Sequence, residues 1–237
     1  MNINIKGFFR NKHVHLNSNE AISIYNRKNT DAAGYLIRKY MLKGCSVVIY
    51  SQNTNFYQYI SDIEAIPMLF TVKSLKNEIK FPYIENITDK AKNSIFECFW
   101  DYKMDHDLIY YQKKNEDSYL CPNPMYRKCF YMINAGGINK DKIFSEGLFT
   151  LLLSQYASED SKRKCIFFID APYRPITKTA LNSIREAERA GATIICMYDS
   201  NRTSDYDNSR YHLTTGKNGK IYFKDKRRKS EIIETDA

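Results

Sequence analysis

The segment Lys164-Cys-Ile-Phe-Phe-Ile-Asp170-Ala171-Pro172 decides the fold of this chain. Its apolar run is typical of a strand buried within a sheet, because both faces of such a strand must be covered. The run ends at an acid, Asp170, and the proline two residues later cannot continue a central strand. The sequence therefore predicts a buried strand that carries a carboxylate at its carboxyl end.

Strand and helix patterns alternate on both sides of this segment. Toward the N-terminus, a strand over Ala21–Tyr25, a helix over Ala32–Lys43 ended by Gly44, and a strand over Ser46–Tyr50 form a βαβ unit. The other expected elements are the strands Lys128–Asn134, Cys165–Ile169 and Thr193–Tyr198, the helix Lys142–Ala157, and a helix that begins at Thr177 or Thr179 and ends before Gly191. This alternation predicts an α/β fold of three layers around a mostly parallel sheet.

All 237 residues are expected to belong to a single α/β domain. Residues 52–125 are less regular, with a helix expected over Phe56–Ile66 and another within Lys80–Trp100. Because this is too much chain for one crossover, we expect an insertion at the sheet edge or a small accessory subdomain. Residues 211–237 are expected to form a hairpin, turning at 216–219, and a basic C-terminal tail.

The formal net charge of +9 is concentrated near the C-terminus. The basic residues of this cluster are Lys217, Lys220, Lys224, Lys226, Arg227, Arg228 and Lys229. Such a cluster would neutralise phosphates, and the interleaved Tyr222 and Phe223 could stack on bases. We therefore expect contact with nucleic acid, and a solvated basic tail is the alternative.

The sequence lacks the patterns of several other protein classes. No apolar run resembles a signal peptide or approaches the roughly 18 to 20 residues that cross a bilayer, so we expect a soluble, cytoplasmic protein without a membrane partner. The six cysteines are scattered without a CxxC pair, which argues against a structural zinc site. No serine lies in a GxSxG turn, so nucleophilic catalysis has little support.

Two acids follow predicted strands that one helix connects. Asp170 ends the first strand and Asp199 follows the second, and such strands are commonly neighbours in a parallel sheet. Carboxylates at adjacent strand ends can hold Mg²⁺, the one cofactor that the sequence suggests. The alternative is that each acid caps the turn or helix that follows it.

The order of elements resembles the HerA/FtsK-like P-loop ATPases, which include DNA translocases and ATPases of conjugation. The resemblance covers residues 21–50 and 128–200, and most of it lies in Phe168–Tyr173, Ala187–Gly191 and Ile194–Ser200. It implies a P-loop fold in which Asp170 orients Mg²⁺ through water, the next residue activates the attacking water, and a polar residue near Asp199 senses the γ-phosphate.

The chain departs from this family at both catalytic motifs. A GxxxxGK[ST] loop wraps phosphates with glycine amides, but the matching loop contains Asn26, Lys28 and Thr30 and no glycine. The residue after Asp170 is Ala171, which cannot accept a proton. We therefore expect a non-hydrolysing subunit of a DNA-translocation, packaging or conjugation-like assembly, with a protein partner or a second copy of itself.

Two other interpretations stay open. A magnesium-dependent nuclease or phosphotransfer enzyme would use Asp170 and Asp199 as ligands, with a third carboxylate drawn from Glu186, Asp205 or Asp207. Glu186 is the weakest of these, because it lies roughly two turns or more into the helix that follows Asp170. The other interpretation is an α/β module that binds a small molecule or a protein partner and no nucleic acid.

Overall fold

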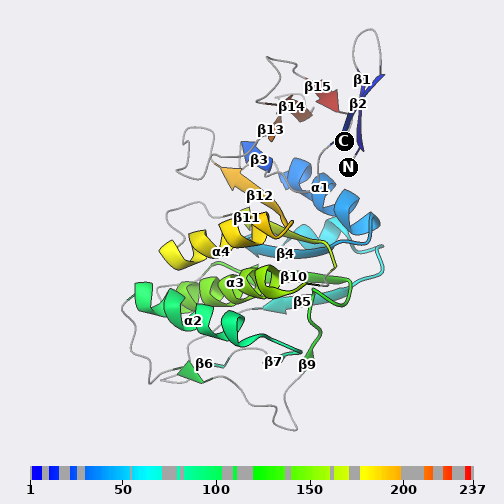
Figure 1. Cartoon of the computed structure of the whole chain (residues 1–237). Helices are drawn as coiled ribbons and strands as arrows, with labels where there is room; N and C mark the ends of the chain where they lie inside the picture. The colour runs from blue at the N-terminus through cyan, green and yellow to red at the C-terminus, as the bar shows by residue number, and fades with distance from the viewer. Residues whose placement is uncertain are drawn as a thin grey trace.

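A long mixed sheet runs through the protein, with helices on both of its faces (Figure 1). The computed structural model describes residues 2–6, 11–15, 22–25, 30–53, 55–70, 79–80, 83–102, 109–110, 120–136, 140–160, 163–170, 177–198, 211–215, 221–225 and 233–235. From one edge to the other, its strands are β5 (Ile66–Phe70), β10 (Cys129–Asn134), β4 (Ser46–Ser51), β11 (Cys165–Asp170), β12 (Thr193–Tyr198), β3 (Ile22–Tyr25), β13 (Tyr211–Thr215), β14 (Ile221–Asp225) and β15 (Ile233–Thr235). The strands from β5 to β13 run parallel to one another. β14 runs antiparallel to its neighbours on both sides, β13 and β15.

The central strands are buried on both faces, as the opening segment predicted. Every residue of β4 and β11 is buried. Successive side chains of a strand point to opposite faces, so alternate residues enter two separate cores. In β11, Phe167 and Ile169 join one core, and Ile166 and Phe168 join the other.

The helices divide between these two cores and complete the three layers. On one face, α1 (Thr30–Leu42) and the short 3-10 helix η1 (Asn55–Tyr59) pack against the sheet. On the other face lie α2 (Asp89–Asp101), α3 (Lys140–Ser158) and α4 (Lys178–Arg189), with α3 in contact with both of its neighbours (Figure 1). The predicted three-layer α/β fold is confirmed.

Helix α3 is buried on all sides, which explains its sequence. Its residues from Phe144 to Tyr156 are all buried, whereas a surface helix would keep one polar face. Buried residues therefore lie on every side of the helix over this stretch. Its buried polar residues are Ser145, Glu146, Thr150, Ser154 and Gln155, and each makes a hydrogen bond.

Local signals set the ends of the helices. Thr88 and Thr177 are the N-caps of α2 and α4, and each hydroxyl accepts a hydrogen bond from a backbone amide of the first turn. Gly44 and Gly191 follow α1 and α4 with φ values of 80° and 97°, a conformation that favours glycine. The predicted start at Thr177 and both glycine stops are confirmed.

The two strands of the predicted βαβ unit are not neighbours. β3 and β4 run parallel in one sheet, but β12 and β11 lie between them. Strand order depends on pairing between distant segments, so the local pattern of residues 21–50 cannot reveal it. The C-terminal hairpin is present as β13 and β14, and it extends the main sheet through the parallel pairing of β13 with β3.

Residues 52–125 contribute to both the sheet and the helical layers. The helix expected over Phe56–Ile66 is wrong, because only Asn55–Tyr59 is helical and β5 begins at Ile66 as an edge strand beside β10. The helix expected within 80–100 is α2. The remaining strands here are β6 (Ile79–Lys80), β7 (Tyr83–Ile84), β8 (Ile109–Tyr110) and β9 (Leu120–Cys121), which form two small parallel pairs.

An N-terminal hairpin of β1 (Asn2–Lys6) and β2 (Asn11–His15) lies beside β15 (Figure 1). This hairpin was not predicted from the sequence. Within the described ranges, no helix combines the length and the apolar character needed to cross a bilayer.

Candidate functional site

The carboxyl ends of the parallel strands form the edge where ligands bind in folds of this kind. Three polar residues lie side by side there, because the strand registers pair Ser51 of β4 with Asn134 of β10 and with Asp170 of β11. Of the three, only Asp170 was predicted from the sequence as a site residue. Ser51 and Asn134 could have been noticed as polar residues that end apolar runs, but nothing local places them beside Asp170.

Asp170 is buried, and Ser51 holds its carboxylate. Only 1% of Asp170 is exposed, and the Ser51 hydroxyl donates a hydrogen bond of 2.7 Å to its Oδ2 atom. The Ser51 oxygen in turn accepts a hydrogen bond of 2.9 Å from the Asn53 amide. Since a buried carboxylate is stable only with such donors, this arrangement satisfies Asp170 within the protein.

The turn between β10 and α3 is fastened to the same edge. The Ala135 amide donates to the Ser51 carbonyl at 2.9 Å, and the Gly136 amide donates to the Asn134 side chain at 2.8 Å. The Ser145 hydroxyl, in the first turns of α3, donates to the Asn134 carbonyl at 2.7 Å. These bonds fix the start of α3 against the ends of β4 and β10.

Two carboxylates close the N-terminus of α4, the helix that follows Asp170. Glu146 of α3 accepts a hydrogen bond of 2.6 Å from the Thr177 amide, and Asp101 of α2 accepts one of 2.8 Å from the Thr179 amide. A helix N-terminus often binds phosphate through its free amides and its partial positive charge. Here the protein's own acids occupy that position, which excludes an anionic ligand from it.

Glu146 is the buried acid that the sequence analysis missed. It is 1% exposed, and its Oε2 atom also accepts a hydrogen bond of 2.7 Å from the Tyr102 hydroxyl. Burial, and then the nearby Glu146, raises the pKa of the Cys98 thiol to about 12 and raises the pKa of Tyr102. The same two causes raise the pKa of Tyr50. A signal existed in the sequence, because this acid interrupts the apolar run of α3.

Part of the predicted site lies within the described residues. β11 and β12 are neighbours, as expected for the strands that lead to Asp170 and Asp199. β3 lies one strand beyond β12, so the start of the predicted phosphate loop is separated from β11 by about 10 Å. Asp199, Asn26 and Lys28 lie outside the described residues, as do Ala171, Asp205 and Asp207; Thr30 is the first residue of α1.

The other predicted residues also lie partly inside and partly outside the described ranges. Lys224 belongs to β14, and the other six basic residues of the C-terminal cluster lie outside the described ranges. Glu186 forms an ion pair with Lys90 at 2.8 Å on the helical layer. It therefore does not supply a third carboxylate beside Asp170.

The described residues do not by themselves fit a magnesium site. Among them, no three histidine, cysteine, aspartate or glutamate side chains gather in a way that could hold a metal ion. One oxygen of Asp170 already accepts a hydrogen bond from Ser51. The chemistry available at this edge from the described residues is therefore hydrogen bonding and charge stabilisation.

The fold has a counterpart among solved structures. The sequence matches no family model and no curated protein. The structure is similar to that of VirB4 of Thermoanaerobacter pseudethanolicus, with a TM-score of 0.57 and 10% sequence identity, over 99% of this chain and 96% of that one. At this identity the likeness shows the fold alone, and it supports the P-loop NTPase-like α/β fold that the sequence predicted.

Proposed function

We propose that this chain is a non-hydrolysing, ATPase-fold component of an assembly that moves DNA, in translocation, packaging or a conjugation-like process. The observation that carries this proposal is the environment of the Asp170 carboxylate. The acid stands at the expected strand end, but it is buried, held by Ser51 and followed by alanine. The likeness to VirB4 supports a P-loop type of fold for such a component.

The expected loss of hydrolysis has a chemical basis. Ala171 cannot activate water, and loss of a general base typically slows a reaction by about 10² to 10⁴. The loop that would cradle the phosphates lacks glycine, and acids close the N-terminus of α4. A chain without these groups contributes its surface to an assembly.

Measuring nucleotide binding and turnover tests the non-hydrolysing role. We expect no ATP hydrolysis above background with Mg²⁺, and no binding of ATP at micromolar concentration by titration calorimetry. Micromolar affinity, or turnover abolished by Asp170→Ala, would contradict the proposal.

The DNA-handling role is tested separately through the basic C-terminal cluster. Each Lys or Arg that contacts a phosphate contributes close to one unit to the slope of log affinity against log salt concentration. Replacing Lys226, Arg227, Arg228 and Lys229 with glutamine should weaken DNA binding and reduce this slope by about 3 to 4. Unchanged binding in this variant would leave the cluster a solvated tail.

A magnesium-dependent nuclease is the second candidate. It is favoured by the pairing of β11 with β12, because Asp170 ends one strand and Asp199 follows the other. Incubating the protein with labelled DNA and RNA in Mg²⁺ or Mn²⁺ tests it. Cleavage that Asp170→Ala abolishes would establish this candidate, and an absence of cleavage would eliminate it.

A further inference from the structure

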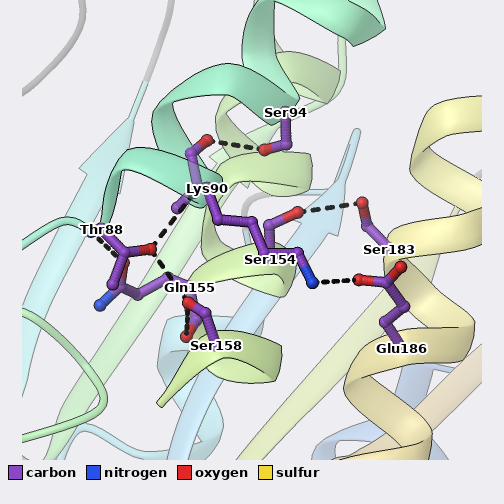
Figure 2. A network of polar contacts seen from close by, with 9 residues as sticks. Thr88, Lys90, Ser94, Ser154, Gln155, Ser158, Ser183 and Glu186 are labelled. Atoms are coloured by element: carbon purple, nitrogen blue, oxygen red, sulfur yellow. Dashed lines mark hydrogen bonds and ion pairs between the residues drawn. The ribbon is translucent and has the colours of Figure 1, made fainter.

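A polar groove lies on the helical layer, between α2 and α4 and over α3. Its volume is about 480 Å³, within the range of pockets that bind ligands. The two helices run antiparallel along it, since Lys90 meets Glu186 at one end and Asp101 meets the Thr179 amide at the other. Figure 2 shows Lys90 reaching from α2 across Ser154 to Glu186.

The floor of the groove offers more acceptors than donors. Ser94, Ser154 and Ser183 line it, and all three are buried. The Ser154 and Ser183 hydroxyls lie 3.1 Å apart and share one hydrogen bond, and Ser94 donates to the Ala91 carbonyl at 2.7 Å. A hydroxyl donates one hydrogen bond and accepts up to two, so acceptor positions remain. The floor suits a group that is rich in N–H donors.

The charges of the groove favour a cation. Its charged lining residues are two carboxylates, Glu97 and Glu186, and one ammonium, Lys90. The Lys90 ammonium already lies 2.8 Å from Glu186, so the protein itself places a cation at this end. Glu97 is exposed about 10 Å further along α2, and no other described residue pairs with it. A second cation could bind there.

An exposed tryptophan flanks the groove. Trp100 is 68% exposed, and it lies two helical turns beyond Asn93, on the same side of α2 as that lining residue. Exposed tryptophan is typical of energetic hot spots at protein interfaces, and its ring also attracts cations. A protein segment can contact both the carboxylate of Glu97 and the ring of Trp100. A free polyamine has no apolar side chain to cover the tryptophan ring.

We propose that this groove docks a segment of a partner protein, in which an arginine or lysine enters beside Glu97 and a neighbouring apolar side chain covers Trp100. The charge of the groove is complementary to such a segment, because its net charge is negative on a chain whose formal net charge is +9. The groove offers little to the phosphates of nucleic acid, because Lys90, the one ammonium among its lining residues, is paired with Glu186. This interaction goes beyond the proposed function, since it depends on neither nucleotide nor DNA.

The test is a titration of the full chain, labelled with ¹⁵N, with the capped peptide Gly-Leu-Arg-Leu-Gly, followed by NMR. We expect the peptide to shift the amide signals of Ser154, Asn182 and Ser183. Glu97→Gln should weaken binding by up to about fivefold, as for an exposed ion pair. Trp100→Ala should weaken it by about two- to fivefold, through loss of cation–π and apolar contact.

Two controls make the result decisive. Glu64→Gln removes a carboxylate from an exposed position outside the groove, and it should leave peptide affinity unchanged. Shifts absent from the groove, or an equal loss of affinity in Glu64→Gln, would overturn the proposal. The proposal would also be overturned if spermidine bound both the wild-type chain and Trp100→Ala more tightly than the peptide does. The groove would then be a polyamine site.

Discussion

At the scale of single residues, Ser51 stabilises the buried carboxylate of Asp170. These residues are 119 positions apart in the chain, and their hydrogen bond joins two buried strand ends. Removing the donor leaves a buried carboxylate with one partner fewer, which costs more than the bond itself contributes.

Ser51→Ala should therefore lower the free energy of unfolding by about 1 to 3 kcal/mol, measured by urea denaturation. Ser61→Ala, which removes an exposed hydroxyl, is the matched control and should change stability by less than about 0.5 kcal/mol. Equal effects of the two substitutions would show that the Ser51 hydroxyl does not stabilise Asp170.

Gly147 makes a different kind of residue-scale contact. A Cβ atom at this position would lie 2.8 Å from two ring atoms of Phe99, which is buried at the contact of α2 with α3. Alanine is normally the better helix former by about 1 kcal/mol, but this clash costs about 1 to 3 kcal/mol. We expect Gly147→Ala to lower the melting temperature, and Phe99→Leu in the same chain to restore part of it. An increase in melting temperature for the single variant would contradict the packing at this contact.

At the scale of elements, two carboxylates hold the N-terminus of α4 with unequal strength. Glu146 is buried and bonds both Thr177 and Tyr102, whereas the bond of Asp101 to the Thr179 amide is exposed. A charged hydrogen bond contributes about 1.5 to 3 kcal/mol, and an exposed carboxylate near a helix N-terminus contributes about 0.3 to 1 kcal/mol.

Glu146→Ala should therefore destabilise the protein several times more than Asp101→Ala, as measured by urea denaturation. Hydrogen exchange should also speed up at the amides of residues 177–180 in the Glu146 variant. Similar stability losses in the two variants would show that the buried carboxylate is not the main anchor of α4.

Local patterns predicted those elements whose environment is simple. β11 and β4 are apolar throughout because both faces are covered, and the helix stops at Gly44 and Gly191 depend on backbone conformation alone. The same reasoning failed for Phe56–Ile66, where β5 gains its strand pairing from β10, far along the chain. Local sequence does not encode such pairing.

The candidate site shows the same contrast between local signals and contacts between distant segments. Asp170 could be predicted because it ends a recognisable strand, but its partner Ser51 could not, because only strand order brings β4 beside β11. Glu146 was missed because an acid in a helix normally lies on an exposed face, whereas α3 is buried on every side from Phe144 to Tyr156. The sequence therefore indicated the carboxyl edge of the sheet, but it did not reveal that Glu146 and Asp101 accept hydrogen bonds from the N-terminus of α4.

At the scale of the whole molecule, buried thiols make stability depend on pH. All six cysteines are buried, and none of them forms a disulfide. Burial and Glu146 raise the pKa of Cys98 to about 12, whereas an unfolded thiol titrates near pH 8.5. A raised thiol pKa means that the unfolded state releases its proton first. The stability linked to Cys98 is therefore complete below about pH 8.5 and is lost as the pH rises toward 12.

We expect the free energy of unfolding to fall above pH 9, and the contribution of Cys98 to reach about 1.4 kcal/mol per pH unit. Urea denaturation at pH 7, 9, 10 and 10.5 measures the slope. Cys98→Ser is the matched control, because a hydroxyl can keep the polar contacts to Thr177 and Glu146 but does not titrate in this range. The slope of this variant should be shallower by the contribution of one thiol, and equal slopes would show that Cys98 is not buried as a neutral thiol in the folded protein.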